Sequence, residues 1–356
     1  MRLSCSAIAL IGGFMKVAVI GCGAQGRGGH VANYNKINDI DLVAVCDVNF
    51  EQAQAVAMEF GIPYVYSDYR ELLDKHNLDL VSVCTPHAFH RDQTVDAFEA
   101  GANVICEKAL AVSSIEAAEM IAACKWHKKK MSMGLQNRGS AEGRILKQFI
   151  DEGGLGKIYY TRVVAGHVMD IPGYSVFHKK SLSGGGVLYS TAVHNLDLAN
   201  WIIGDPTPVA AMGTIYQKVR HMKNPLISWK GTLGDFETED FAAGYIRFEN
   251  DSGLSIESNW LTHPWKVRPQ IEILGDYGTA EIPLKIYVDQ GNQVFDRTPK
   301  ITESGNHFFE VLKDFVDAVR EDRTPIVKFS QMLHVQQMME GIYQSAETGK
   351  EVLIGK

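Results

Sequence analysis

The sequence has few cysteines, and their placement disfavours both disulfides and zinc. Six occur among the 356 residues, each alone in its segment, at positions 5, 22, 46, 84, 106 and 124. No two are close enough to form a CxxC pair. Cys46, Cys84 and Cys106 fall near the ends of apolar segments, so buried free thiols in a reducing compartment are the better explanation.

Long hydrophobic runs and an excess of positive charge are also missing. No apolar run reaches the ~18 residues that a membrane-spanning helix needs, so no membrane is expected. With 35 basic and 42 acidic residues the formal net charge is −7, which argues against nucleic acid as a partner.

Residues 1–14 faintly resemble a signal peptide, but cleavage there would almost remove the first predicted strand. We therefore expect Met15-Lys16 to be the natural beginning, residues 1–14 to be a tail or an upstream start, and the location to be cytoplasmic.

Length and composition favour a globular protein of two domains. In residues 15–137, short apolar runs alternate with segments of helical periodicity. The predicted strands cover residues 16–20, 41–46, 63–66, 80–84, 103–106 and 131–135, and the predicted helices cover 50–60, 88–100 and 113–127. Runs rich in valine, isoleucine and alanine suit strands buried on both faces. The pattern predicts a doubly wound parallel α/β sheet of the Rossmann type, which binds nucleotides.

Residues 138–356 show a different sequence pattern, with longer runs in which polar and apolar residues alternate. These predict strands over 157–166, 208–219, 241–249, 253–260 and 268–274, and helical periodicity appears in 191–203, 308–319 and 332–346. Alternation of this kind is typical of an antiparallel sheet with one face packed. We expect an α+β domain with a large open, mostly antiparallel sheet, and its C-terminal helices are candidates to pack back on the first domain.

A glycine-rich turn follows the first predicted strand. It reads Gly21-Cys22-Gly23-Ala24-Gln25-Gly26 and opens a helical segment, the context that a dinucleotide-binding motif requires. Glycines there let the backbone approach a pyrophosphate, although glycines serving only a structural turn are the alternative. Asp47 ends the second strand about 20 residues later, where a carboxylate binds ribose hydroxyls. Because no arginine follows Asp47, NAD is predicted in preference to NADP.

Polar residues also follow the strand at 80–84, on the edge where ligands of such sheets bind. Thr85-Pro86-His87 stands there, so all three are candidate cofactor contacts. His90 could cap the next helix or reach the nicotinamide ribose. Ordinary loop or helix-start roles for both histidines are an equally weighted alternative.

Glu107-Lys108 follows the apolar segment 102–106. Oxidising an alcohol requires a group that removes the hydroxyl proton while hydride passes to the nicotinamide. A pyridinium cation nearby disfavours the ammonium form of a lysine, and lowering its pKa from about 10.4 to about 7.5 takes roughly 4 kcal/mol. In the reductive direction the ammonium would polarise the carbonyl. Lys108 is predicted to be catalytic and to contact the cofactor, and Glu107 to orient it or bind the ribose; a surface ion pair is the alternative.

Gly184-Gly185-Gly186 leads into a helix that carries His194 and Asp197 on one face. Such a histidine can exchange protons with a substrate hydroxyl while the carboxylate orients or charges it. His194 is therefore the second candidate catalytic residue, with a purely structural histidine as the alternative. Other possible metal ligands in this region match no zinc motif in their spacing, and no metal is expected; they are His167, Asp170 and His178.

Together these segments resemble the glucose–fructose oxidoreductase, inositol dehydrogenase and MocA family (Gfo/Idh/MocA). The resemblance runs from Met15 to the C-terminus and rests on the order and spacing of modest motifs. These are residues 17–26, 66–73, Thr85-Pro86, Glu107-Lys108, the triple glycine with His194 and Asp197, and residues 314–319 and 343–350. Membership implies a Rossmann domain, a second domain whose open sheet forms contacts in a homo-oligomer such as a dimer or tetramer, and sugar or cyclitol-like substrates. It also places Lys108 and His194 at the reacting carbon.

The resemblance adds further candidates and shows departures. Asn137 is a candidate cofactor contact, and the candidate substrate contacts are Arg138, His167, His178, Ser190 and Asp197. The family usually has a proline where this chain has Ala109, an aspartate where it has Ser190, and a glycine where it has Ala192. A hydroxyl can bind a substrate hydroxyl but cannot hold His194 as a cation, so the proton chemistry could rest on Lys108.

Three functions are left open at this point. The first is an NAD-dependent dehydrogenase or reductase acting on CH–OH groups of a sugar, glycoside or cyclitol. The second is an enzyme with tightly bound NAD that uses transient oxidation for net glycoside cleavage or isomerisation. The third is a cofactor-sensing protein without catalysis; Ser190 alone supports it, and the presence of both Lys108 and His194 argues against it.

Overall fold

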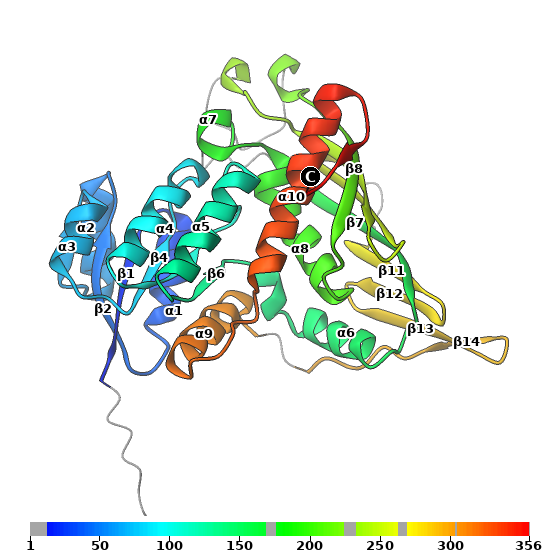
Figure 1. Cartoon of the computed structure of the whole chain (residues 1–356), viewed down its shortest axis with the longest axis horizontal. Coiled ribbons are helices and arrows are strands. Elements are labelled where there is room, and N and C mark those ends of the chain that lie inside the picture. Colours follow the sequence, from blue (N-terminus) through cyan, green and yellow to red (C-terminus); the bar gives the residue numbers. More distant parts are fainter. Residues whose placement is uncertain (1–12, 169–175, 224–232, 263–268, 303–304, 356) are drawn as a thin grey trace, which may run out of the picture.

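The computed structural model describes residues 13–168, 176–223, 233–262, 269–302 and 305–355, and it contains two sheets (Figure 1). The first sheet is parallel, with six strands in the order β3-β2-β1-β4-β5-β6. Its strands are β1 (Met15–Ile20), β2 (Ile40–Cys46), β3 (Tyr64–Tyr66), β4 (Leu80–Val83), β5 (Asn103–Cys106) and β6 (Met131–Met133). The order reverses at β1 and β4, as in dinucleotide-binding sheets. This confirms the predicted doubly wound α/β architecture.

Helices connect these strands and are capped as their sequences suggest. They are α2 (Phe50–Phe60), α3 (Tyr69–Lys75), α4 (His90–Glu99) and α5 (Ser114–Trp126). Asn49, Asp68 and Ser113 each accept a hydrogen bond from a main-chain amide of the first turn. The segment after β1 is different, because it begins as a π-helical turn, η1 (Gln25–Val31), before the short α1 (Ala32–Tyr34).

The second sheet has nine strands in the order β14-β13-β12-β11-β7-β10-β9-β8-β15. They are β7 (Ile158–Val168), β8 (Pro208–Tyr216), β9 (Phe241–Phe248), β10 (Gly253–Thr262), β11 (Ile271–Gly275), β12 (Gly278–Ile282), β13 (Lys285–Gln290), β14 (Gln293–Asp296) and β15 (Val352–Leu353). Among the described strands of this sheet, only β7 and β10 pair in parallel, so the mostly antiparallel sheet is confirmed. Strands β12 to β15 were not predicted, because short strands separated by tight turns show little periodicity.

The C-terminal helices join the two sheets. The longer helices after β6 are α6 (Ala141–Asp151), α8 (Val193–Ile202), α9 (His307–Arg320) and α10 (Phe329–Thr348), and α7 (Lys180–Ser183) is a single turn. Helix α9 buries Leu312 and Phe315 in a core shared with β1 and β2. Helix α10 contributes Met332 to the core of the first sheet and Ile342 to that of the second. Figure 1 shows α10 running between the two parts.

Two expectations from composition can be compared with the described residues. Among these residues, no helix has both the length and the apolarity to cross a bilayer. The cysteines present there carry free thiols, partly exposed at Cys84 and buried at Cys22, Cys46, Cys106 and Cys124. Cys5 lies outside the described residues.

Candidate active site

The glycine turn after β1 packs closely against neighbouring backbone and leaves one position open. Gly21 has φ of 96°, and a Cβ atom there would lie 2.6 Å from the carbonyl carbon of Cys84. A Cβ atom on Gly26 would lie 1.8 Å from the Gly21 carbonyl oxygen, so neither position admits a side chain. At Gly23 nothing lies within 4 Å of that point. The backbone from Gly23 through Ala24 and Gln25 is therefore open to a ligand where η1 begins.

Asp47 stands beside this turn, directly after β2. Its Oδ2 atom accepts a hydrogen bond from the Cys22 amide at 2.8 Å, and its Oδ1 atom accepts one from the Asn49 amide at 2.9 Å. The Gln52 side chain donates to the Cys22 carbonyl at 2.7 Å, which fixes the turn against α2. Asp47 is only partly buried, so its carboxylate keeps lone pairs for further donors.

The two histidines after β4 hold the backbone around Lys108. The His87 ring donates from Nδ1 to the Ser183 carbonyl (2.7 Å) and accepts at Nε2 from the Ala109 amide (3.1 Å). Burial, and then the nearby His90, lower the pKa of His87 to about 3, so its ring is neutral. His90 contacts the carbonyl oxygens of Thr85 at 2.7 Å and Ala109 at 3.0 Å. Because main-chain groups engage both ring nitrogens of each histidine, the described geometry gives them a supporting role.

The other predicted cofactor contacts lie on the same edge. Thr85 donates through Oγ1 to the Gln93 side chain at 2.6 Å. Pro86 precedes the short helix η2 (His87–Phe89) and sets its entry. Asn137 donates to the Asn195 side chain at 3.2 Å. Thr85 and Asn137 are partly exposed, so each can still meet a ligand.

Glu107 and Lys108 lie at the end of β5, with 4% and 9% of their surface exposed. The alternative of a surface ion pair is therefore wrong. The Lys108 amine donates to the main-chain carbonyl of Ser190 at 2.8 Å and lies 5.6 Å from the centre of the Phe177 ring. Burial lowers the pKa of Lys108, and the charge of Glu107 opposes that effect more weakly. The amine thus has a fixed position and an increased neutral fraction; the peptide bond that follows it is cis.

A buried carboxylate fastens the triple-glycine loop. Glu239 accepts hydrogen bonds from the Gly186 amide at 2.8 Å and from the Leu188 amide at 3.0 Å. The next turn, η4 (Leu188–Ala192), is π-helical, a form that often occurs at functional sites. In this turn the Ser190 hydroxyl donates to the Gly186 carbonyl at 2.8 Å. The loop is thus held so that the Ser190 carbonyl meets Lys108.

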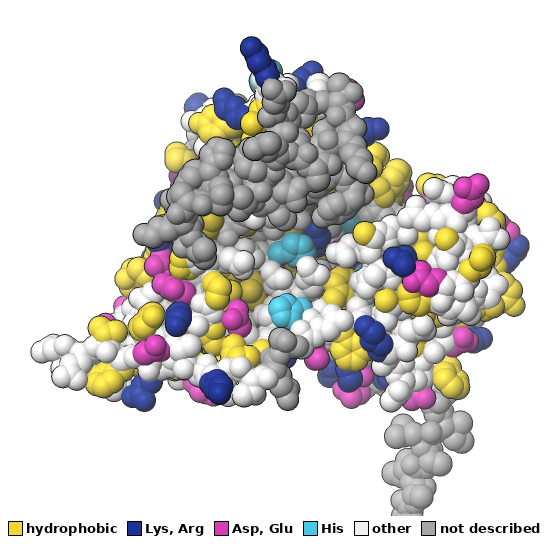
Figure 2. All heavy atoms as spheres, turned by 180° about the vertical axis from the view of Figure 1, so that it is seen from behind, with side chains coloured by type: hydrophobic (Ala, Val, Ile, Leu, Met, Phe, Trp, Pro, Cys, Tyr) yellow, Lys and Arg dark blue, Asp and Glu magenta, His cyan; other side chains and the backbone are white. Residues whose placement is uncertain are grey.

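His194 lies at the start of α8, partly buried and close to Lys108. Burial, and then the charge of Lys108, lower the pKa of His194 well below its usual range, so its ring is neutral. Within the described part of the chain, no group hydrogen-bonds to its Nδ1 atom, which suits a ring that receives a ligand. Figure 2 shows histidine side chains at the surface where the two parts of the molecule meet.

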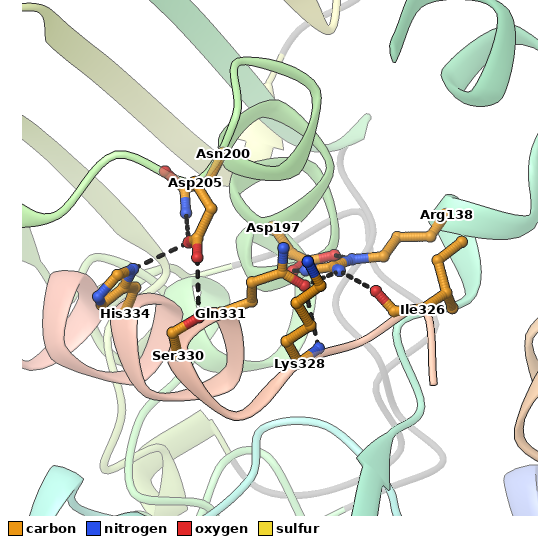
Figure 3. Close-up of polar contacts among 9 residues, drawn as sticks. All are labelled: Arg138, Asp197, Asn200, Asp205, Ile326, Lys328, Ser330, Gln331 and His334. Carbon is orange, nitrogen blue, oxygen red and sulfur yellow. Dashed lines mark hydrogen bonds and ion pairs between the residues drawn. The ribbon is translucent and has the colours of Figure 1, made fainter. Parts of the chain in front are cut away.

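Asp197 does not orient His194 as predicted, because its carboxylate is paired with Arg138 (Figure 3). The guanidinium donates from Nη2 at 2.5 Å and from Nε at 2.8 Å. Its remaining nitrogen, Nη1, reaches the Gln331 side chain at 2.6 Å and the Ile326 carbonyl at 3.1 Å. Both charged groups are fully buried. Instead of the predicted contact with substrate, the pair joins α8 to the start of α10.

The remaining candidates give less information. The His178 ring packs 6.1 Å from the Phe236 ring, measured between centres. His167 lies in β7, one residue before its end, but its side chain lies outside the described residues, as does all of Asp170. Over the described ranges, no group of three or more metal-ligating side chains gathers, and a metal-free site stays a prediction.

Both parts of the chain match family models. Residues 15–135 match the model described as an oxidoreductase family with an NAD-binding Rossmann fold, and residues 144–281 match the GFO/IDH/MocA C-terminal domain. The chain belongs to the GFO/IDH/MocA family. The resemblance inferred from the motifs is confirmed, and this family member is an oxidoreductase that uses NAD.

Similar proteins act on sugars and cyclitols. D-glucoside 3-dehydrogenase of Escherichia coli (strain K12) is 31% identical over 343 residues, covering 95% of this chain and 97% of the relative. Myo-inositol 2-dehydrogenase of Thermotoga maritima is 24% identical over 326 residues, covering 88% and 90% of the two chains. A levoglucosan dehydrogenase solved with NADH and levoglucosan superposes with a TM-score of 0.82 at 23% identity, covering 96% and 100%. That last likeness shows a shared fold.

The residues at the glycine turn of this family member fit NAD. The open backbone at Gly23 and the excluded side chains at Gly21 and Gly26 allow close approach of a pyrophosphate. The partly exposed Asp47 lies beside the turn, where it can accept bonds from ribose hydroxyls. Two residues that were not predicted support the site: Glu239 binds the amides of the triple-glycine loop, and His30 contacts the Glu107 carboxylate next to Lys108. Neither residue stands at a spacing that any motif marks.

Proposed function

We propose that this GFO/IDH/MocA oxidoreductase oxidises a ring hydroxyl of a glycoside or a related sugar, with Lys108 exchanging the hydroxyl proton. The observation that carries the proposal is the buried Lys108 amine, which is held by the Ser190 carbonyl beside the neutral His194. The coverage of nearly the whole chain by D-glucoside 3-dehydrogenase supports a glucoside as the substrate class.

The chain's own groups account for the proton and the orientation of the substrate. NAD, when bound, takes up the hydride. As a neutral amine, Lys108 accepts the hydroxyl proton at Nζ, and as an ammonium it returns that proton in the reductive direction. The partly exposed ring of His194 can accept a hydrogen bond from a substrate hydroxyl. Because Ser190 brings no carboxylate to this face, His194 stays neutral and Lys108 carries the proton transfer.

The cofactor contacts follow from the same edge of the sheet. The main chain from Gly23 to Gly26 binds the pyrophosphate, and Asp47 binds the adenosine ribose. Asp47 repels a 2′-phosphate, so NAD is preferred to NADP. Thr85 and Asn137 are partly exposed and supply polar contacts toward the nicotinamide end.

A substrate screen tests the proposal. The full-length protein is assayed with NAD or NADP and a panel of glucosides, free sugars and inositols, and NADH absorbance is followed. We expect NAD reduction that is fastest with a glucoside. Turnover only with NADP would overturn the role of Asp47, and no reduction with any member of the panel would overturn the proposed activity. Consumption of a glycoside without net NADH formation would instead favour transient oxidation with tightly bound NAD.

We also infer that the outer face of the nine-stranded sheet joins two copies of the chain. Helix α10 packs on the inner face, where a Cβ atom on Gly213 or Gly244 would meet Ile342. On the opposite face, Met212 and Tyr245 are cross-strand partners and both are exposed, as is Tyr216. An exposed apolar cluster of this kind marks an interaction surface.

Sedimentation velocity of Tyr245→Asp tests this interface. The variant should sediment as a smaller species than the wild-type protein. Trp126→Asp, at an exposed position on α5, is the matched control and should not change the oligomeric state. A monomeric wild-type protein would contradict the inference.

The free thiols support a cytoplasmic location, which cell fractionation would test.

A further inference from the structure

Four buried side chains form a hydrogen-bonded chain beneath Lys108. The Tyr34 hydroxyl lies 2.7 Å from Ser82 Oγ, which lies 2.9 Å from His30 Nδ1. His30 Nε2 lies 3.1 Å from Glu107 Oε1. All four residues are buried. The chain runs from η1 and α1, across β4, to the carboxylate next to Lys108.

The chemistry of the groups sets the direction of this chain. An ionised carboxylate only accepts hydrogen bonds, so His30 Nε2 donates to Glu107. In the neutral ring Nδ1 then accepts from the Ser82 hydroxyl, which in turn accepts from Tyr34. Every hydroxyl and ring nitrogen is matched, as buried polar groups require. A satisfied network of this kind fixes the rotamers of its members.

Glu107 is held from two further sides. Its Oε2 atom accepts a hydrogen bond from the Lys108 amide at 3.2 Å. Across from His30, a Cβ atom at Gly134 would lie only 2.5 Å from Oε1, so the backbone of Gly134 closely bounds the carboxylate. Within the described ranges, the titratable groups whose charges act on Lys108 are Glu107, His87 and His194. Among these three, Glu107 alone brings a negative charge.

We propose that His30 is a positioning residue, which fixes the Glu107 carboxylate and thereby sets the basicity of the Lys108 amine. The consequence for turnover rests on the proposed function of Lys108, whereas the effect on the amine does not. His30 belongs to the π-helical turn that starts at the cofactor-binding glycines, and Phe308 of α9 packs edge-on against its ring at 5.0 Å. One hydrogen-bonded chain thus links this turn to the Glu107 carboxylate, which directly precedes Lys108.

Loss of the Nε2 donor should shift the titration of the Lys108 amine in one direction. A buried carboxylate without that donor turns away or takes up a proton, because an unpaired charge is costly in a buried site. Lys108 then loses the charge that favours its ammonium form. The Lys108 amine should therefore titrate at lower pH when His30 cannot donate to Glu107.

A matched pair of amide variants tests this coupling. His30→Gln places an amide nitrogen near the position of Nε2 and can still donate to Glu107, whereas His30→Asn places it near Nδ1 and cannot. Competitive acetylation followed by peptide mass spectrometry reports the titration of Lys108 itself, with exposed lysines as internal standards. We expect the Lys108 midpoint to fall by about one pH unit in His30→Asn, the low end for loss of a neighbouring charge, and to stay near that of the wild-type protein in His30→Gln.

Two further variants keep the test decisive if His30→Asn folds poorly. Glu107→Gln removes the charge while leaving His30 in place, and it should lower the midpoint in the same direction. Tyr34→Phe removes only the far end of the chain and should leave the midpoint unchanged. A Lys108 midpoint that is equal in wild type, His30→Asn and Glu107→Gln would overturn the proposal. Activity retained by Lys108→Met would overturn the proposed function instead, because the acetylation result does not depend on turnover.

Discussion

The amine of Lys108 and the main-chain carbonyl of Ser190, 82 positions apart in the sequence, lie 2.8 Å apart in the structure. One comes from the end of β5 in the parallel sheet, and the other from the π-helical turn before α8. A carbonyl accepts from an amine and, more strongly, from an ammonium. The contact therefore holds Nζ in place in both protonation states, as a group that both takes and gives a proton requires.

Replacing Lys108 should remove catalysis and leave cofactor binding. Lys108→Met keeps an unbranched side chain that is one atom shorter and has no basic nitrogen, so kcat should fall by about 10²–10⁴-fold. NAD affinity, measured by fluorescence titration, should change little. Lys285→Met, at an exposed position of β13, is the control. More than a tenth of the wild-type kcat in Lys108→Met would show that another group moves the proton.

The rate should depend on pH in opposite ways in the two directions. Burial lowers the pKa of Lys108 from its usual range, so the neutral amine that oxidation needs appears at lower pH than for an exposed lysine. The kcat for oxidation should rise with pH through that pKa, and the kcat for reduction should fall through it, because reduction needs the ammonium. Profiles of both directions check this. If kcat changed in the same direction with pH for oxidation and for reduction, Lys108 would be excluded as the shared acid and base.

Asp47 should control the choice of cofactor. Asp47→Asn can still accept from the Cys22 amide but loses the charge that strengthens bonds with ribose hydroxyls. Bonds to charged groups contribute about 1.5–3 kcal/mol, so KM for NAD should rise roughly 10- to 100-fold. The ratio of kcat/KM for NAD over NADP should fall with it. An unchanged ratio of kcat/KM for NAD over NADP would show that another group distinguishes the adenosine ribose of the two cofactors.

The Arg138–Asp197 pair should matter for stability more than for substrate binding. Arg138→Met or Asp197→Leu alone leaves one buried charge without its partner, which should reduce the free energy of unfolding by about 3–5 kcal/mol. The double variant should recover most of this loss, because apolar groups can replace a buried pair. Urea denaturation measures the effect. A large rise in substrate KM for the folded double variant would restore the substrate-binding role that the sequence suggested.

Local patterns in the sequence predicted much of the fold and the centre of the site. The buried strands of the first sheet and helix α2 over residues 50–60 follow from periodicity and composition. Lys108 and the glycine turn were visible because each follows an apolar strand.

Long-range pairing was not visible in the sequence. Asp197 shares a helix face with His194, yet its partner is Arg138, 59 positions earlier. Glu239 reaches the triple glycine from a segment more than 50 positions later. The π-helical turns η1 and η4 arise where tertiary contacts override local propensity. The spacing of residues predicts neighbours within one helix or strand, so it does not predict contacts between different helices and strands.

Helix α10 has a consequence for dissecting the protein. Met332, near its beginning, belongs to one hydrophobic core, and Ile342, near its end, to the other, while α9 completes the underside of the parallel sheet. A fragment that stops at residue 137 would therefore lack part of its own interior and expose the apolar surface that these helices cover. Heating the intact chain should accordingly melt both halves in a single calorimetric peak.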